Sequence, residues 1–222
     1  MTLRNTMNSM RLAGSSAAVL AILAGAAQTS QALPTIPYQN PGTPNPITYT
    51  FTAAASGDVI AYFAGSGASY DEKLGMLDNG VATSAGLGLD DHTSTIGQSF
   101  DLGTVTAGDT LTFFIDVLSP NLGNVYSNPA LNTGYDTDGS QGHNHIYSTA
   151  YSDGSLGAGI PNGTYVGFED LQFPDSDFNY FDETYVFTDV ASVSNVPDSA
   201  SSITLLTMAL AGLGVVRRRL CA

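Results

Sequence analysis

Alternation of apolar and polar residues is the feature that most constrains what this 222-residue chain can fold into. Residues 47–52 (Ile-Thr-Tyr-Thr-Phe-Thr) alternate strictly, and in residues 110–117 every second side chain from Leu111 to Val117 is apolar. Side chains at every second position lie on one face of a strand. No sustained 3.6-residue stripe, the sign of an amphipathic helix, occurs between residues 47 and 190. We therefore expect an all-β fold of the β-sandwich or jelly-roll kind.

Turn residues separate further candidate strands. Asp78-Asn79-Gly80 predicts a tight hairpin, because Asn-Gly favours positive φ. The glycine-rich stretch 65–88 around it and the polar stretch 129–142 are expected to be long surface loops. Strands are predicted at residues 58–64, 74–77, 144–151, 163–168 and 184–190.

The N-terminal residues have the order of a secretory signal. Arg4 and Arg11 form a positive region, an apolar stretch follows at residues 12–27, and Ser30-Gln31-Ala32 offers the small residues that signal peptidase requires. We expect residues 1–32 to be a signal peptide that is cleaved after Ala32. No Cys comes directly after the apolar stretch, so a lipid anchor is not indicated.

A single exported domain is expected between the two ends of the chain. Residues 33–46 hold five prolines and predict an extended leader. Residues 47–195 are enough for one domain with a core.

The C-terminal residues have the order of a sorting signal. Residues 196–202 read Val-Pro-Asp-Ser-Ala-Ser-Ser, residues 203–216 are apolar, and residues 217–219 are three arginines. The apolar segment would span about 21 Å as a helix, less than a full bilayer crossing prefers. The arginines would hold its end in the cytoplasm. We expect a short transmembrane helix at 203–216 that anchors the chain transiently, with a permanent tail anchor as the alternative.

This order resembles the sorting signal of bacterial PEP-CTERM proteins, in the Val-Pro-Asp-Ser-Gly-Ser/Thr variant, with Ala200 in place of Gly. The resemblance implies cleavage near the motif by exosortase, a membrane-embedded cysteine protease-transpeptidase. It also implies passage through the inner membrane of a Gram-negative-type bacterium to the cell surface or extracellular matrix. The expected processing residues are Ala32 for signal peptidase and Val196, Pro197, Asp198 and Ser199 for exosortase.

Without these two signals the chain is almost purely acidic. Lys73 is the only Lys or Arg between residues 33 and 195, against 19 of the 20 acids, which gives a net charge of about −18. Such a surface disfavours nucleic acid and anionic lipid. The only cysteine, Cys221, follows the arginines, so the exported domain has no disulfide. Cations are its natural partners. Aspartate-rich loops that bind calcium are one interpretation, and a solvated acidic surface is the other.

The densest acidic stretch is residues 169–183. Asp175, Asp177 and Asn179 have the D-x-D-x-N spacing that supplies oxygens for calcium. Tyr180 and Val186 stand where an EF-hand needs Gly and Glu, so we expect a calcium site in a strand-to-strand loop. The alternative is a set of turn residues on a solvated edge. The candidate ligands are Glu169, Asp170, Asp175, Asp177, Asn179, Asp182 and Glu183.

Smaller polar clusters are weaker candidates. Asp136 and Asp138 lie in a Tyr-Asp-Thr-Asp-Gly-Ser turn, and residues 90–92 read Asp-Asp-His. Both are expected to be turns rather than metal sites. His143 and His145 share one side of a strand, which could suit a transition metal, but a hydrogen-bonding role is expected for His145.

Residues 143–151 (His-Asn-His-Ile-Tyr-Ser-Thr-Ala-Tyr), 160–170 (Ile-Pro-Asn-Gly-Thr-Tyr-Val-Gly-Phe-Glu-Asp) and 176–180 (Ser-Asp-Phe-Asn-Tyr) carry a second resemblance. They resemble the C-terminal half of an uncharacterised exported β domain that is frequent in PEP-CTERM proteins. The resemblance implies location and fold more than chemistry.

Three functions follow as hypotheses. The first is a non-enzymatic surface or matrix protein, associated with exopolysaccharide and ordered by calcium. The second is a carbohydrate-binding module that uses Tyr147, Tyr151, Tyr165 and Tyr180. The third is a glycan-acting hydrolase with Glu169 and Asp182 as its acids. The absence of Trp, of a Gly-x-Ser-x-Gly elbow and of a His-Glu-x-x-His motif disfavours the third.

Overall fold

The computed structural model describes residues 36–139 and 142–195. The predicted signal peptide, the apolar segment 203–216 and the processing residues lie outside these ranges. Within them, no helix is long and apolar enough to cross a membrane.

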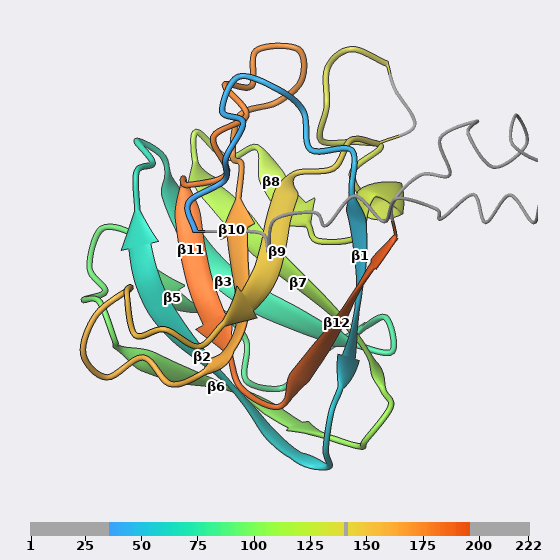
Figure 1. Ribbon diagram of the computed structural model, residues 1–222. Coiled ribbons are helices and arrows are strands. Elements are labelled where there is room, and N and C mark those ends of the chain that lie inside the picture. Colours follow the sequence, from blue (N-terminus) through green and yellow to red (C-terminus); the bar gives the residue numbers. More distant parts are fainter. Residues whose placement is uncertain (1–35, 140–141, 196–222) are drawn as a thin grey trace, which may run out of the picture. The chain divides into compact units, whose positions relative to one another are not determined.

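The described chain forms two antiparallel sheets that pack as a sandwich, which confirms the expected all-β fold (Figure 1). The first sheet has the order β12 (Val190–Asn195), β1 (Thr48–Ala53), β7 (Thr110–Ser119), β3 (Asp71–Asp78) and β4 (Val81–Ala82), with β5 (Gly88–Asp90) paired to β3 and β8 (Gly123–Tyr126) paired to β7. The second sheet has the order β6 (Ser99–Val105), β2 (Gly57–Ser66), β11 (Glu183–Phe187), β10 (Gly163–Phe168) and β9 (Ile146–Tyr151). A short 3-10 helix, η1 (Pro129–Leu131), follows β8.

The predicted hairpin joins β3 to β4. Asp78 pairs with Val81, and Asn79 and Gly80 both have positive φ, 47° and 82°. This is the backbone conformation that an Asn-Gly turn favours.

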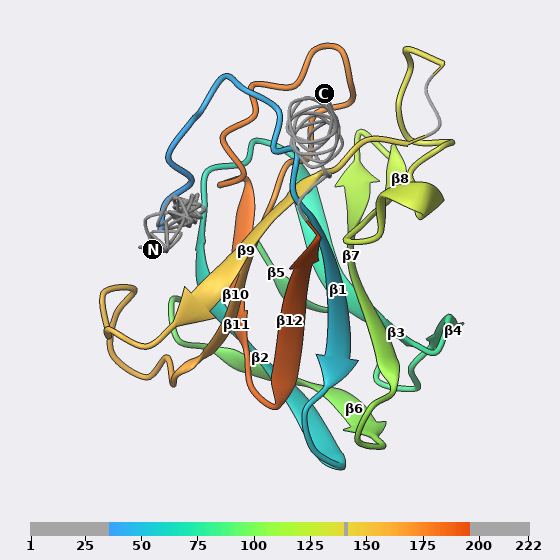
Figure 2. The same ribbon diagram turned by 45° about the vertical axis from the view of Figure 1, so that its right-hand side comes forward.

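Two sequence predictions need correction. The stretch 65–88 is not a loop, because it contains β3, which pairs with β7 over most of its length. The strand predicted at 184–190 is two strands in different sheets, and the chain turns between them at Asp189, which has a φ of 58°. β12 lies beside β1 at one edge of the first sheet (Figure 2). β6 was not predicted, because its sequence has little apolar alternation.

The main core lies between the two sheets. Every second residue of β7 from Leu111 to Val117 faces it, as the alternation predicts. Phe113 is central: its ring lies 3.9 Å from that of Phe187 in the second sheet and 5.3 Å from that of Phe51 in the first, measured between centroids. These rings join the two layers.

A second apolar cluster covers the outer face of the second sheet. It gathers Tyr147, Tyr165 and Tyr180 with Tyr38 of the proline-rich leader. Tyr38 lies 4.9 Å from Tyr180 between ring centroids. From Ile36 onward the leader is therefore packed against the domain.

We predict that Phe113→Ala lowers the free energy of unfolding by about 3–5 kcal/mol, because it leaves a cavity between the sheets. Urea denaturation measures this change. Leu131→Ala is the control, since Leu131 is exposed and its truncation should cost less than about 0.5 kcal/mol. Equal losses in the two variants would contradict the central role of Phe113.

Candidate metal centre

The end of the second sheet where β10 finishes and β11 begins carries three carboxylates. Glu169, Asp170 and Asp182, which we call the acidic centre, are all buried. One oxygen of each lies within 4.8 Å of the others, close enough to share one ion. In Figure 1 the connection between β10 and β11, in orange, lies at the top of the view.

Backbone hydrogen bonds fix the acidic centre to the sheet. Glu169 N donates to His145 O at 2.9 Å, and Asp182 N donates to Phe168 O at 3.1 Å. Asp170 N donates to Asp182 Oδ2 at 2.9 Å. Both ends of the connection are thus held in register, and the carboxylates between them converge.

Gly167 lets the connection return close to β10. A Cβ at this position would lie 2.2 Å from Tyr180 O, so no larger residue fits. Tyr180 itself has a φ of 53° and is buried under the leader. The close approach brings Asn179 beside Glu169.

Asp177 and Asn179, in the β10–β11 connection, lie at the open side of the acidic centre, which we call its mouth. Asn179 N donates to Glu169 Oε2 at 3.1 Å and to Asp177 Oδ1 at 3.0 Å. An open hollow of about 310 Å³ lies there. It is lined by Gly67, Ala68, Ser69, Tyr70, Asp170, Leu171, Asp177, Asn179 and Asp182. Four of the seven predicted ligands therefore line one hollow, with Glu169 behind them.

The other two predicted ligands lie elsewhere. Asp175 is exposed in a turn and is not part of the acidic centre, and its backbone N donates to Gln172 O. Glu183 is buried on β11, where its Oε2 accepts a hydrogen bond from Tyr185.

A glutamate from the opposite sheet interacts with the acidic centre through the Asp170 carboxyl group. Glu72 on β3 is 0% exposed, and neither of its oxygens has a hydrogen-bond partner among residues 36–139 and 142–195. It pairs in register with Val117, a core residue, so it faces the space between the sheets. Glu72 was not among the predicted ligands, although it continues the every-second-residue pattern of Leu74 and Met76.

Burial and mutual repulsion raise the pKa of every acid in this group. Burial raises the pKa of Glu169 to about 7, with a further contribution from the charge of Asp177. The pKa of Asp182 is raised by burial and then by Asp170 and Glu169. Burial followed by the Asp170 carboxyl raises that of Glu72. Like charges this close either keep a proton or need a cation.

Asp136 and His145 support the acidic centre through a chain of hydrogen bonds that ends at the backbone of Glu169. His145 is fully buried, with Nδ1 2.9 Å from Glu169 O and Nε2 2.9 Å from Asp136 Oδ1. Both ring nitrogens therefore face an acceptor oxygen. Asp136 Oδ1 also accepts from Phe173 N at 3.0 Å. Burial alone would raise the pKa of Asp136, but these hydrogen bonds outweigh it and lower the pKa.

The two histidines do not form a shared metal site. His143 Nε2 lies 2.6 Å from Asp138 Oδ2, and its ring stacks on Phe173 at 3.8 Å between centroids. His145 is engaged by Asp136, as its expected hydrogen-bonding role requires.

The tyrosines proposed for carbohydrate binding are buried. Tyr147, Tyr151, Tyr165 and Tyr180 all belong to the apolar cluster on the outer face of the second sheet. Their rings pack against protein and offer no open face to a sugar. This overturns their assignment as surface contacts.

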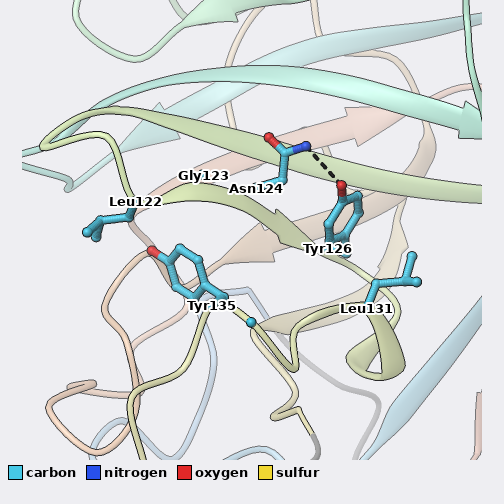
Figure 3. Close-up of a pocket in the computed structure, with 7 residues that line it drawn as sticks. Leu122, Gly123, Asn124, Tyr126, Leu131 and Tyr135 are labelled. Atoms are coloured by element: carbon cyan, nitrogen blue, oxygen red, sulfur yellow. Dashed lines mark hydrogen bonds between the residues drawn. The ribbon is translucent and has the colours of Figure 1, made fainter.

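Another hollow, of about 290 Å³, lies beside β8 (Figure 3). Asn124 Nδ2 donates to Tyr126 Oη at 2.9 Å within it. Its lining contains no carboxylate, amine or imidazole. It therefore holds neither an acid–base pair nor a strong metal ligand.

The comparisons with known proteins concern the C-terminus. Residues 195–220 match the family model of the VPDSG-CTERM motif. The chain thus carries a PEP-CTERM-like exosortase-sorting motif, as the sequence resemblance implies, and the motif supports a secreted or cell-surface protein. The resemblance to an uncharacterised exported β domain is consistent with the fold. Comparison with curated proteins and with solved structures gave no match.

We predict that Asp136→Ala lowers the free energy of unfolding by about 2–3 kcal/mol, because it leaves two buried donors, His145 Nε2 and Phe173 N, without their acceptor. Asp138→Ala is the matched control. Asp138 is partly exposed and pairs with His143, so its loss should cost less than about 1 kcal/mol. Urea unfolding of both variants in EDTA measures the difference, and equal effects would contradict the supporting role.

Proposed function

We propose that this protein is a non-enzymatic exported surface or matrix protein whose β-sandwich binds calcium at the acidic centre. One observation carries the calcium proposal: three buried carboxylates, those of Glu169, Asp170 and Asp182, converge, and no Lys or Arg neutralises them or the buried, unpartnered carboxylate of Glu72. Lys73, the only such residue between positions 33 and 195, pairs with Asp90 instead, at 3.6 Å.

The donor set favours calcium over other divalent ions. The ligands on offer are carboxylate and amide oxygens, which hard cations prefer. The hollow is open and its ligands come from a loop, which suits the flexible coordination of Ca²⁺ better than the octahedron that Mg²⁺ demands. Glu169, Asp170 and Asp182 would hold the ion, with Asp177 and Asn179 at the mouth and Glu72 from β3.

A bound ion would act on the structure of the domain. Glu72 belongs to the first sheet, and the other carboxylates lie in the connection between β10 and β11 of the second. An ion held by both would link the two layers at this end of the sandwich and would favour the ionised form of each acid.

The geometry favours this structural role over a hydrolase. A glycosidase needs two carboxyl groups that both reach the substrate. Glu169 is 0% exposed, does not line the hollow, and uses one oxygen to hold Asn179. Of the two acids predicted for a hydrolase only Asp182 lines the hollow, so this pair does not flank a glycosidic bond there.

Saturating calcium is expected to raise the melting temperature of the purified protein by about 5–10 °C over its value in EDTA, at free calcium of 100 times the dissociation constant. Magnesium at the same concentration should give a smaller shift. Differential scanning calorimetry measures both. No shift with calcium would overturn the proposal.

Glu169→Gln combined with Asp182→Asn should reduce this calcium-induced shift, because it removes two charged ligands. In EDTA the same variant should melt no lower than the wild type, since it also relieves repulsion. Asp175→Asn is the matched control and should keep the full shift, because Asp175 is exposed outside the acidic centre.

The proposed location rests on the sorting motif and the signal peptide expected from the sequence. Signal peptidase would release residues 1–32, and the segment 203–216 would hold the chain in the inner membrane until exosortase acts. Association with exopolysaccharide is part of the same proposal and is supported only by the sorting motif.

Intact mass spectrometry of the protein from its native cells should show loss of residues 1–32 and of the residues that follow the Val196 motif. Pro197→Ala combined with Asp198→Ala should retain the arginines at 217–219, because the cleavage motif is destroyed. A wild-type protein that keeps these arginines would instead be permanently anchored.

A further inference from the structure

A second set of acids lies at the start of β3 and the end of β5. Asp71, Asp90, Asp91 and His92, which we call the β3–β5 acidic group, each place one ligand atom within 4.8 Å of the others. A hollow of about 390 Å³ opens there. It is lined by Ser69, Asp71, Asp90, His92, Thr93 and Ser119.

Hydrogen bonds fix the β3–β5 acidic group to the backbone. Asp91 Oδ1 accepts from Glu72 N at 3.0 Å, and the Asp91 side chain is 2% exposed. Asp90 Oδ1 accepts from Thr93 N at 3.0 Å and so closes the turn after β5. The two acids are therefore held in place rather than spread into solvent.

The buried carboxylate of Glu183 is independent evidence for a ligand near this group. It is 0% exposed, and its Oε1 has no hydrogen-bond partner in the part of the chain that the structure describes. Phe168 is its cross-strand neighbour and a core residue, so Glu183 also faces the space between the sheets.

The surroundings of Glu183 show which acids it faces. Tyr185 Oη donates to Glu183 Oε2 and lies 3.5 Å from the carbonyl oxygen of Leu89, the residue before Asp90. Burial raises the pKa of Glu183 well above its usual range, and Asp91 and Asp90 add to this more than Asp170 does. Through Tyr185, Glu183 is thus linked to the end of β5, directly before Asp90.

The charges already present do not neutralise this group. Lys73 Nζ lies 3.6 Å from Asp90 Oδ2, and its side chain is partly exposed. The four carboxylates of Asp71, Asp90, Asp91 and Glu183 are thus accompanied by one partly exposed amine. Asp71 Oδ1 is also buried without a hydrogen-bond partner within residues 36–139 and 142–195.

We infer that the β3–β5 acidic group is a second site for a hard divalent cation of the calcium type, bound by Asp71, Asp90, Asp91 and Glu183. His92 Nδ1 pairs with Asp91 Oδ2 at 2.9 Å and stays outside the ligand set. This site goes beyond the proposed one and has no ligand in common with it. Asp71, Asp90 and Asp91 belong to the first sheet or its turn and Glu183 to the second, so this ion also links the layers.

Native mass spectrometry of the purified protein, stripped with EDTA and titrated with calcium chloride, counts the bound ions. We expect two per chain at saturation. Asp91→Asn and Glu183→Gln should each bind one, and Glu169→Gln combined with Asp182→Asn should also bind one. Asp153→Asn, on an exposed loop, is the control and should bind two. Near-UV circular dichroism in EDTA identifies the variants that keep the native tyrosine environment.

The possible counts separate the two sites. A wild type that binds one ion, lost in the Glu169 and Asp182 variant, overturns the second site and leaves the proposed function standing. One ion that is lost instead with Asp91→Asn supports the second site and overturns the first. Two ions retained by both Asp91→Asn and Glu183→Gln overturn the inference, and a wild type that binds none overturns both sites.

Discussion

The burial of carboxylates at one end of the sandwich is the constraint on which the rest of this structure depends. All three glutamates of the chain, Glu72, Glu169 and Glu183, are fully buried, and each has an oxygen without a hydrogen-bond partner among the described residues. Taking one unpaired ionised carboxylate out of water costs several kcal/mol. A domain with a total stability of about 5–15 kcal/mol does not hold three of them ionised and unpaired. They must either keep protons near neutral pH, as their raised pKa values describe, or share cations.

Cations would also explain how this end of the sandwich stays closed. Stacked rings such as Phe113 on Phe187 hold the middle of the core between the sheets. Near the ends of β3 and β11, Glu72 and Glu183 occupy positions in the same space where apolar residues would otherwise pack. No disulfide is available to the exported domain, because its only cysteine lies at position 221. Ions held between the two sheets would supply cross-links there, and the free energy of binding them would add to the free energy of folding.

The fold was largely readable from the sequence, but the site was readable only in part. The alternation in β1 and β7 and the Asn-Gly turn predict local structure, because they depend on neighbouring residues alone. The acids of the β10–β11 connection stood out as a run of close spacing. Glu183 was predicted with that run, but its place between the sheets was not, and Glu72 was not predicted at all, because both depend on two sheets that face each other. The alternation along β3 could have identified Glu72, because Glu72, Leu74 and Met76 occupy every second position of this strand. The turn at Asp189, which separates β11 from β12, depends on tertiary structure and leaves no pattern in the neighbouring sequence. The same holds for the burial of the tyrosines.

Location and stability are encoded in separate parts of this chain. The sorting motif lies at residues 195–220 and includes three of the six Lys and Arg residues, while the domain keeps only Lys73. Removal of the tail would therefore leave the carboxylates with one amine and whatever cations the surroundings provide. A basic residue placed near the acidic centre would neutralise it without any ion, yet the domain has none there. Any ion that neutralises these carboxylates would therefore have to come from the surroundings of the domain, which for a chain with this sorting motif are those of a secreted or cell-surface protein.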